Sequence, residues 1–256
     1  MPKIDRDGVN IHYEVHGDGP PLILTHGYSS TSAMWKGQVE ALSKHHRLIL
    51  WDMRGHGASD YPDDGALYSE ALTVGDIAAL LDEVGAKKAI VGGLSLGGYM
   101  SLAFYRAHPD RVRALLIIDT GPGFKKDDAR AAWNRRALDT AERFDREGLE
   151  VLKSASRERS TVSHRNARGL ALAARGMLTQ RDARVIEVLP EIKVPSLVVV
   201  GADDAPFLAA SDYMAAKIPG AQKVVIPAAG HAVTIDQPQA FIEAVLPFLD
   251  GLPKSA

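Results

Sequence analysis

Residues of three types that together can carry out nucleophilic catalysis occur in order along this chain. Ser95 stands in the segment GLSLG, residues 93–97, which fits the pattern Gly-x-Ser-x-Gly. A serine hydroxyl is a poor nucleophile at neutral pH, so it needs a base, and the base needs an acid to orient it. His231 could serve as the base, and Asp203 or Asp204 as the acid. The chemistry that these residues suggest is attack on a carbonyl carbon.

The glycines beside Ser95 predict a sharp turn between a strand and a helix. The apolar run KAIVGG at 88–93 is typical of a buried strand, and SLGGYMSLAFYRAHP at 95–109 predicts a helix that its final proline ends. Such a turn is too tight for side chains at its flanking positions. It would expose the hydroxyl and aim the first helical N–H at charge developing on a substrate. The alternative is a glycine turn with a purely structural role.

Strands and helices alternate along most of the chain, which places these residues on a sheet. Apolar or alternating runs predict strands at 10–17, 20–27, 47–57, 88–93, 112–119, 195–204 and 222–231, and helical spacing predicts helices at 72–86, 95–109 and 237–249. This alternation indicates a mainly parallel sheet with helices on both faces. Right-handed crossovers put the loops that follow the strands at one edge, where functional groups gather. Ser95, Asp204 and His231 all stand at such strand ends.

One region, residues 123–190, interrupts the alternation. It is rich in Ala, Arg and Leu at helical spacing, and it holds 15 Lys and Arg against 10 Asp and Glu, whereas the rest of the chain holds 15 and 22. We expect residues 1–122 and 191–256 to form an α/β core and residues 123–190 to form a helical cap over the sheet edge. The basic residues of this region are also compatible with ordinary solvated helix faces.

Composition narrows the classes of partner and cofactor. The chain has 256 residues, no cysteine and a formal net charge of −2, so neither disulfides nor binding to nucleic acid is expected. The segment MPKIDRDGVN lacks the apolar run of a signal peptide, and no run is long enough to span a membrane, so we expect a cytoplasmic protein. The histidines show no ligand spacing and no phosphate loop occurs, so neither a metal nor a cofactor is expected. A monomer and a homodimer both remain open.

Five motifs occur in the order in which α/β-hydrolase-fold proteins carry them, and the resemblance covers nearly the whole chain. They are THGYSS for the oxyanion loop, DMRGHGASD for a glycine-rich turn, GLSLGG for the nucleophile turn, VVVGADD for the acid loop and AGHAVTIDQPQAF for the histidine loop. The resemblance is to the branch of esterases and lactonases with a serine nucleophile. It implies a mostly parallel eight-stranded sheet flanked by helices, with an inserted helical cap.

The resemblance also implies roles for individual residues. Ser95 would be the nucleophile and His231 the general base. The family's acid usually lies three residues after the glycine that ends the strand, which is Asp204 here, so that Asp203 would cap the loop or face solvent. Some relatives carry the acid after the sixth strand instead, where this chain has Asp119.

The oxyanion hole and the pocket follow from the same resemblance. The backbone N–H groups of Tyr28 and Leu96 would bind the oxyanion, and the Tyr28 side chain could line the pocket. Residues expected to brace the surrounding loops are His26, Asp52, Arg54 and Ser59. Residues expected as pocket walls, or else as plain packing, are Phe124, Trp133, Met177, Leu178, Phe207 and Val233.

The function expected is hydrolysis of a small-molecule carboxylic ester or lactone through an acyl-enzyme, without a cofactor. A serine at the turn excludes haloalkane dehalogenases, which resemble this chain but carry an aspartate there. Hydrolases of 3-oxoadipate enol-lactone, carbon–carbon bond hydrolases of aromatic catabolism, and perhydrolases use the same three residue types and remain alternatives. A ligand-binding module without turnover is a further one. Apolar candidate walls favour a small to medium, largely apolar acyl group, and the basic cap leaves room for an anionic substrate.

Overall fold

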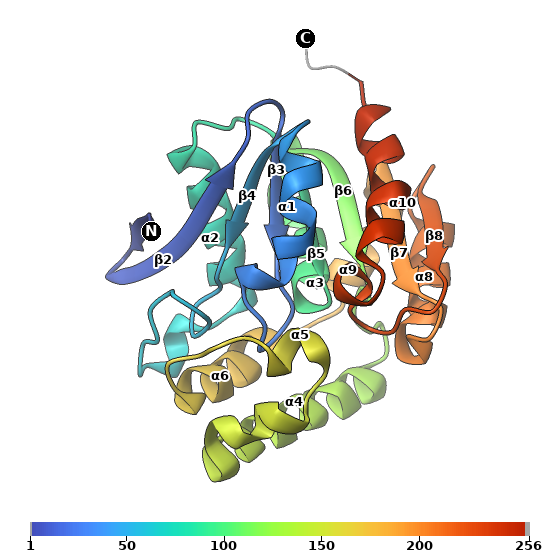
Figure 1. Cartoon of the computed structure of the whole chain (residues 1–256). Helices are drawn as coiled ribbons and strands as arrows, with labels where there is room; N and C mark the ends of the chain where they lie inside the picture. The colour runs from blue at the N-terminus through green and yellow to red at the C-terminus, as the bar shows by residue number, and fades with distance from the viewer. Residues whose placement is uncertain (1, 254–256) are drawn as a thin grey trace.

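An eight-stranded sheet runs through the centre of the molecule in the computed structural model, which describes residues 2–253 (Figure 1). The spatial order is β1-β2-β4-β3-β5-β6-β7-β8, with β1 and β2 antiparallel and all pairs from β4 to β8 parallel. The strands are β1 (Lys3–Arg6), β2 (Val9–His16), β3 (Pro21–Thr25), β4 (Arg47–Trp51), β5 (Ala89–Leu94), β6 (Val112–Ile118), β7 (Ser196–Gly201) and β8 (Gln222–Ile226). The predicted mostly parallel, eight-stranded sheet is confirmed.

The central strands are apolar along their whole length because helices cover both of their faces. Every residue of β5 and of β7 is buried, as expected for parallel strands inside an α/β fold. The seven strands predicted from runs of apolar residues are all present. The first strand, β1, was not predicted individually, because its four residues, KIDR, carry a single apolar side chain.

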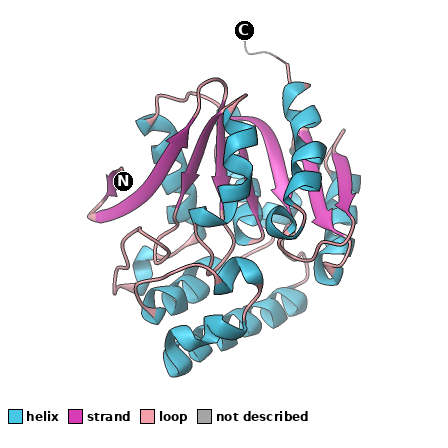
Figure 2. Ribbon diagram, in the orientation of Figure 1, coloured by secondary structure: helices cyan, strands magenta, loops and turns pink. Residues whose placement is uncertain are grey.

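Two layers of helices sandwich the sheet (Figure 2). One face is covered by α1 (Lys36–Ser43), α9 (Val233–Asp236) and α10 (Pro238–Asp250), and the other by α2 (Glu70–Glu83), α3 (Leu96–Ala107) and α8 (Ala205–Lys217). Alternate side chains of β3 point to opposite faces of the sheet. Leu22 and Leu24 pack in the core that contains Phe241, whereas Ile23 packs in the core that contains Phe104. Short 3-10 helices are η1 (Ser32–Trp35), η2 (Gly65–Leu67) and η3 (Pro109–Arg111).

The stretch between β6 and β7, residues 119–195, contains helices and no strand, and all of it is described. We call it the β6–β7 connection. Its elements are α4 (Asp127–Glu147), η4 (Gly148–Ser154), α5 (Arg157–Ser160), α6 (Ala167–Ala173), the π-helical turn η5 (Ala174–Leu178), α7 (Arg184–Glu187) and η6 (Leu189–Glu191). Figure 1 shows α4, α5 and α6 below the lower edge of the sheet. Hydrogen bonds attach the connection to the loop after β3; in two of them Tyr28 donates to the Leu170 carbonyl and Ser30 to the Glu158 carbonyl, both at 2.9 Å.

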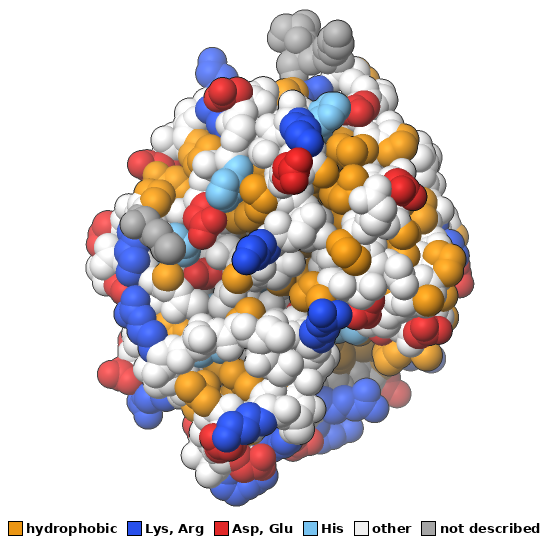
Figure 3. Space-filling view, viewed as in Figure 1, with side chains coloured by type: hydrophobic (Ala, Val, Ile, Leu, Met, Phe, Trp, Pro, Cys, Tyr) orange, Lys and Arg blue, Asp and Glu red, His pale blue; other side chains and the backbone are white. Residues whose placement is uncertain are grey.

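The visible surface carries charges of both signs. Figure 3 shows hydrophobic side chains scattered over this face and Lys and Arg side chains frequent at the lower end, where α4 lies. Within residues 2–253, no helix combines the length and the apolar character that crossing a bilayer requires.

Candidate functional site

Ser95 occupies the turn between β5 and α3 in a backbone conformation that side chains rarely adopt. Its φ is 56° and its ψ is −118°, so this single residue reverses the chain direction between strand and helix. A Cβ at Gly97 would lie 2.1 Å from the Thr25 carbonyl oxygen, and a Cβ at Gly93 would lie 2.6 Å from the same atom. The two glycines are therefore needed because β3 passes against the turn, as the sequence pattern predicted. Strain of this kind concentrates at functional sites.

His231 and Asp204 are brought together by the loops after β8 and β7. The imidazole Nδ1 lies 2.8 Å from Asp204 Oδ2, and the Phe207 ring stacks on the imidazole with centroids 4.9 Å apart. A carboxylate oxygen can only accept, so Nδ1 carries the proton and Nε2 is left to accept one. Burial lowers the pKa of His231, but the hydrogen bond and the charge of Asp204 outweigh it, so the pKa is raised above its usual value of 6.5.

Asp119 and Asp203, the other two carboxylates considered from the sequence, have different partners. Asp119 is fully buried and accepts the backbone N–H groups of Gly201 at 2.8 Å and Val233 at 3.2 Å. Burial raises the pKa of Asp119 to about 7. Asp203 is exposed. Of the three acids, Asp204 is the one hydrogen-bonded to His231.

Two backbone N–H groups beside Ser95 are free to bind a ligand oxygen. Leu96 is the first residue of α3, and the first N–H groups of a helix have no intrahelical partner. Tyr28 follows Gly27, at which a Cβ would lie 3.5 Å from the Ser95 Cβ. Within residues 2–253, neither the Tyr28 nor the Leu96 N–H donates to another backbone or side-chain acceptor.

Three histidines hold the loop that carries Tyr28. His26 Nε2 accepts the Met53 N–H at 3.0 Å, and His56 Nε2 accepts the Ser29 N–H at 3.1 Å. His164, from the β6–β7 connection, places Nε2 3.1 Å from the Ser29 carbonyl oxygen. The bonds accepted by His26 and His56 require neutral rings, and so does the bond at 3.3 Å that His164 Nδ1 accepts from the Gly57 N–H. Burial lowers the pKa of each ring, that of His56 well below its usual value and that of His164 to about 4.

The other bracing residues expected from the sequence also contact the loops around the turn. Asp52 accepts the backbone N–H of Ser32 at 2.7 Å, and Ser59 donates to the Asp52 carbonyl oxygen at 2.6 Å. Arg54 is buried and forms two hydrogen bonds with Asp76, at 2.7 and 2.8 Å. The glycine-rich turn is thus held by side-chain contacts on both of its sides.

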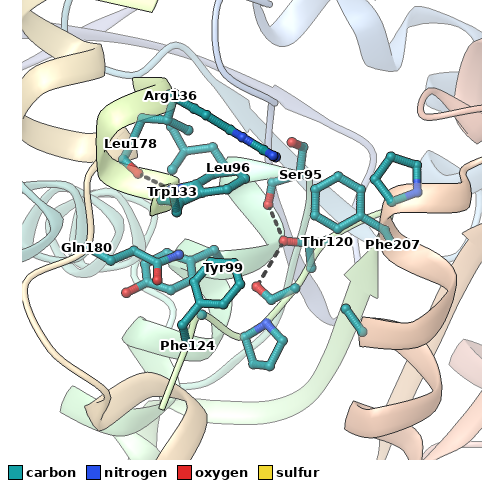
Figure 4. A pocket seen from close by; sticks show the side chains of 15 residues that line it. Ser95, Leu96, Tyr99, Thr120, Phe124, Trp133, Arg136, Leu178, Gln180 and Phe207 are labelled. Atoms are coloured by element: carbon teal, nitrogen blue, oxygen red, sulfur yellow. Dashed lines mark hydrogen bonds between the residues drawn. The ribbon is translucent and has the colours of Figure 1, made fainter. Parts of the chain in front are cut away.

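A cavity of about 360 Å³ opens beside Ser95 and is lined mainly by apolar side chains (Figure 4). We call it the larger cavity. Four residues expected as pocket walls line it: Phe124, Trp133, Leu178 and Phe207. Among the lining residues that were not expected are Tyr99, Thr120, Arg136 and Gln180. The Thr120 hydroxyl donates to the Ser95 carbonyl oxygen at 2.7 Å, which ties the wall of the larger cavity to the turn.

A second cavity of about 220 Å³, the smaller cavity, contains both Ser95 and His231. Tyr28 lines it, and so do polar residues from the β6–β7 connection: Ser156, Glu158 and Arg159. Ser95 also lines the larger cavity, so it stands where the two cavities meet. Met177 and Val233 line neither cavity, which corrects the expectation for these two residues. Both side chains are buried, at 1% and 0% exposure, in the hydrophobic cores of the two faces.

Four of the polar cavity residues missed from the sequence share one property. Arg136, Glu158, Arg159 and Gln180 all belong to the β6–β7 connection, whose charged residues have the spacing of a solvated helix surface. No motif distinguishes a charged residue over the site from one facing solvent. Their position depends on how the connection packs against the sheet edge, which is a tertiary property.

Comparison with known proteins gives a consistent result. A model of the alpha/beta hydrolase family matches residues 22–244. A Bacillus subtilis protein provisionally named 2-succinyl-6-hydroxy-2,4-cyclohexadiene-1-carboxylate synthase is 30% identical over 96% of this chain and 97% of its own length.

Two solved structures are similar over nearly their full length. The enol-lactonase from Burkholderia xenovorans LB400 is 28% identical, covering 97% of this chain and 100% of its own, with a TM-score of 0.79. A thermophilic esterase from Thermogutta terrifontis, in a structure with malate bound, is 29% identical, covering 98% of this chain and 99% of its own, with a TM-score of 0.84.

Proposed function

This chain belongs to the alpha/beta hydrolase family, and from that premise we propose that it is a serine hydrolase that cleaves a carboxylic ester or lactone through an acyl-enzyme, without a cofactor. One observation carries the proposal: His231, oriented by Asp204 at 2.8 Å, shares a cavity with Ser95. The similarity to an esterase and to an enol-lactonase supports an ester or lactone as the scissile group.

In the first half of the proposed reaction, Ser95 Oγ attacks the carbonyl carbon and its proton passes to His231 Nε2. The carbonyl oxygen gains negative charge and accepts the N–H groups of Tyr28 and Leu96. The hydrogen bond to Asp204 stabilises the imidazolium that forms. His231 then gives the proton to the leaving oxygen as the carbonyl–oxygen bond breaks, which leaves the acyl group on Ser95.

In the second half, water attacks the acyl-enzyme. His231 takes a proton from the water, and the Tyr28 and Leu96 N–H groups again hold the oxyanion. Collapse of the intermediate releases the carboxylic acid and returns the proton to Ser95. A hole of two backbone donors is preorganised by the fold, because α3 fixes one donor and the histidine-braced loop fixes the other.

The two cavities would take the two halves of the substrate. The leaving oxygen must reach His231, and His231 lines the smaller cavity and not the larger one. We therefore assign the leaving group to the smaller cavity and the acyl group to the larger one. The apolar walls of the larger cavity suit a small to medium acyl chain.

We further propose that residues 123–190 form a cap that limits access of bulk water to the site. The bonds from Tyr28 to Leu170 and from Ser30 to Glu158 support this role, because they attach the β6–β7 connection to the loop of the oxyanion hole. Excluding water strengthens the electrostatic interactions that stabilise the oxyanion.

A second candidate function is hydrolysis of an enol-lactone that carries a carboxylate. Arg136 and Arg159 line the two cavities that meet at Ser95, and a guanidinium is suited to binding a carboxylate. The similarity to an enol-lactonase points in the same direction. This substrate would use the same acyl-enzyme steps.

The test is steady-state hydrolysis of p-nitrophenyl acetate and butyrate by the wild-type protein and by Ser95→Ala. The proposal expects turnover of both esters in the wild type and its loss in the variant. Hydrolysis that survives in Ser95→Ala would overturn it. Turnover of an anionic enol-lactone far above that of the p-nitrophenyl esters would select the second candidate.

A further inference from the structure

The turn that carries Tyr28 has a serine at a position where glycine is favoured. The Ser30 N–H donates to the Gly27 carbonyl oxygen at 3.1 Å, which closes a four-residue turn with Tyr28 and Ser29 at its centre. Ser29 has a φ of 53°, whereas the φ of Tyr28 is not positive. A turn of this kind favours glycine at its third residue, because a residue with a Cβ is strained there. The serine at position 29 therefore needs an explanation.

Side chains from other parts of the fold bind each polar group of Ser29, which is fully buried. Its N–H donates to His56 Nε2, and its carbonyl oxygen accepts from His164 Nε2, both at 3.1 Å. Its hydroxyl oxygen accepts the Nε–H of Arg159 at 2.5 Å. A glycine at position 29 could keep the first two bonds but not the third. The contact with Arg159 is thus what the serine adds to the turn.

Arg159 has no stabilising ion pair that would explain its position. It belongs to α5 in the β6–β7 connection, and burial lowers its pKa. Within residues 2–253 it pairs with no carboxylate, and the adjacent Glu158 accepts from the Ser156 hydroxyl instead. A partly buried charge without an opposite partner costs stability. The guanidinium carbon lies 5.9 Å from the centroid of the Tyr28 ring, so Arg159 contacts both central residues of the turn.

The turn determines where one of the two candidate oxyanion donors lies. The free Tyr28 N–H belongs to it, and Gly27 places the turn against Ser95, because a Cβ at Gly27 would lie 3.5 Å from the Ser95 Cβ. The Leu96 N–H is fixed by α3, whereas the Tyr28 N–H depends on the conformation of the turn. Oxyanion donors are effective because they are held in place before the reaction begins.

We propose that Arg159 is a positioning residue of the oxyanion hole: through Ser29 Oγ, it holds the turn of residues 27–30 in the conformation that presents the Tyr28 N–H to the substrate oxygen. This inference rests on the proposed function. The oxyanion hole is then completed by the β6–β7 connection and not by the α/β core alone. Negative charge develops on the substrate oxygen only in the transition states, and both acylation and deacylation use the hole. Arg159 therefore contributes to kcat and not to KM.

The experiment measures kcat and KM with p-nitrophenyl butyrate, an uncharged ester that offers a guanidinium no anionic group. Complete loss of one oxyanion donor costs about 100- to 1,000-fold, so a misplaced donor in Arg159→Met should lower kcat by about tenfold or more at a similar KM. Arg157→Met is the matched control. Arg157 is exposed on the same helix and lines neither cavity, so this variant should stay near the wild-type rate. A loss confined to KM would overturn the proposal, because Arg159 would then bind the substrate itself.

A double-mutant cycle tests whether Arg159 acts through Ser29. Ser29→Ala removes the acceptor of the bond whose donor Arg159→Met removes. Two changes that break one interaction are not additive, so each single variant and the double variant should lose kcat by about the same factor. Losses that multiply in the double variant would overturn the proposal, because Arg159 would then act independently of Ser29.

Ser29→Gly separates positioning from stability. Glycine suits a φ of 53°, so Ser29→Gly should melt no lower than Ser29→Ala, yet it should show the same loss of kcat. A wild-type kcat in Ser29→Gly would overturn the proposal, because the serine hydroxyl would then have no part in catalysis. In each of these outcomes the wild type still cleaves p-nitrophenyl butyrate. Failure of the proposed function itself would instead appear as no turnover by the wild type.

Discussion

Asp204 Oδ2 lies 2.8 Å from His231 Nδ1, while Asp119, the other acid near this histidine, gives both of its oxygens to backbone N–H groups. The two carboxylates therefore have separable roles in our account. Asp204 fixes the tautomer of His231 and stabilises its charged form. Asp119 joins the end of β7 to the start of α9 through Gly201 and Val233.

The first prediction concerns this division. Asp204→Asn should lower kcat by about a thousandfold or more, because an amide favours the wrong imidazole tautomer and does not stabilise the imidazolium. The measurement is kcat with p-nitrophenyl butyrate. Asp203→Asn is the matched control, because Asp203 is the exposed neighbour of Asp204, and it should stay near the wild-type rate.

Asp119→Asn should differ from both Asp204→Asn and Asp203→Asn in its effects on kcat and on stability. An amide would direct its NH₂ group at one of two backbone N–H donors, so we expect a lower melting temperature and a smaller loss of kcat than in Asp204→Asn. The opposite result would be a large loss of kcat, of the size predicted for Asp204→Asn, in Asp119→Asn and a small loss in Asp204→Asn. In that case the acid that orients His231 would have to be Asp119.

The second prediction is the pH dependence of catalysis. His231 must be neutral to act as a base, so kcat/KM should fall on the acid side as the imidazole gains a proton. Its pKa is raised because the effect of Asp204 outweighs that of burial, so the midpoint of the acid limb should lie above 6.5. In Asp204→Asn the midpoint should move to lower pH. An acid limb that does not move in this variant would contradict the assigned pair.

The third prediction concerns backbone strain at the nucleophile. Ser95 has a φ of 56°, which costs a residue with a Cβ about 1–3 kcal/mol and a glycine much less. Ser95→Gly and Ser95→Ala should both be inactive, but Ser95→Gly should have the higher free energy of unfolding, by about 1 kcal/mol. Chemical denaturation of the two variants measures the difference. Equal stabilities would mean that the turn is not strained in solution.

The fourth prediction concerns stability at acid pH. Burial lowers the pKa of His164 to about 4, so the unfolded chain binds a proton there before the folded protein does. The neutral His164 ring therefore contributes to the free energy of unfolding above pH 6.5. This contribution, at most about 3 kcal/mol, is lost as the pH falls toward 4. His164→Asn should flatten this part of the pH–stability curve, and the same substitution at exposed His45 should leave its slope closer to that of the wild type. A slope unchanged by His164→Asn would contradict this origin.

The parts of the fold that could be predicted from the sequence are those written in local patterns. Buried strands such as β5 and β7 appear as short apolar runs, because helices cover both of their faces. The turn at Ser95 could be predicted because it leaves a local pattern, a glycine at positions 93 and 97. Glycine is needed at both positions because β3 leaves no room for a side chain there. β1 was not predicted individually, because its one buried residue, Ile4, gives no pattern.

For the candidate site, the sequence predicts which residues come together but not how they contact one another. Ser95, Asp204 and His231 follow strands, so topology alone brings them to one edge of the sheet. The choice between Asp203 and Asp204 needed the resemblance, which left Asp119 as an alternative, and the contact of Asp204 with His231 is visible only in three dimensions. Gln180 could not be predicted, because its place depends on pairing with Asn134, 46 residues away, and on the conformation of Gly123.

The most direct test of the central claim, that Ser95 forms the acyl-enzyme, is to treat the protein with a fluorophosphonate and locate the adduct by mass spectrometry of its peptides. The account predicts a single adduct on Ser95, absent in Ser95→Ala and formed far more slowly in Asp204→Asn. Labelling of another residue, or of none while p-nitrophenyl esters are turned over, would contradict it.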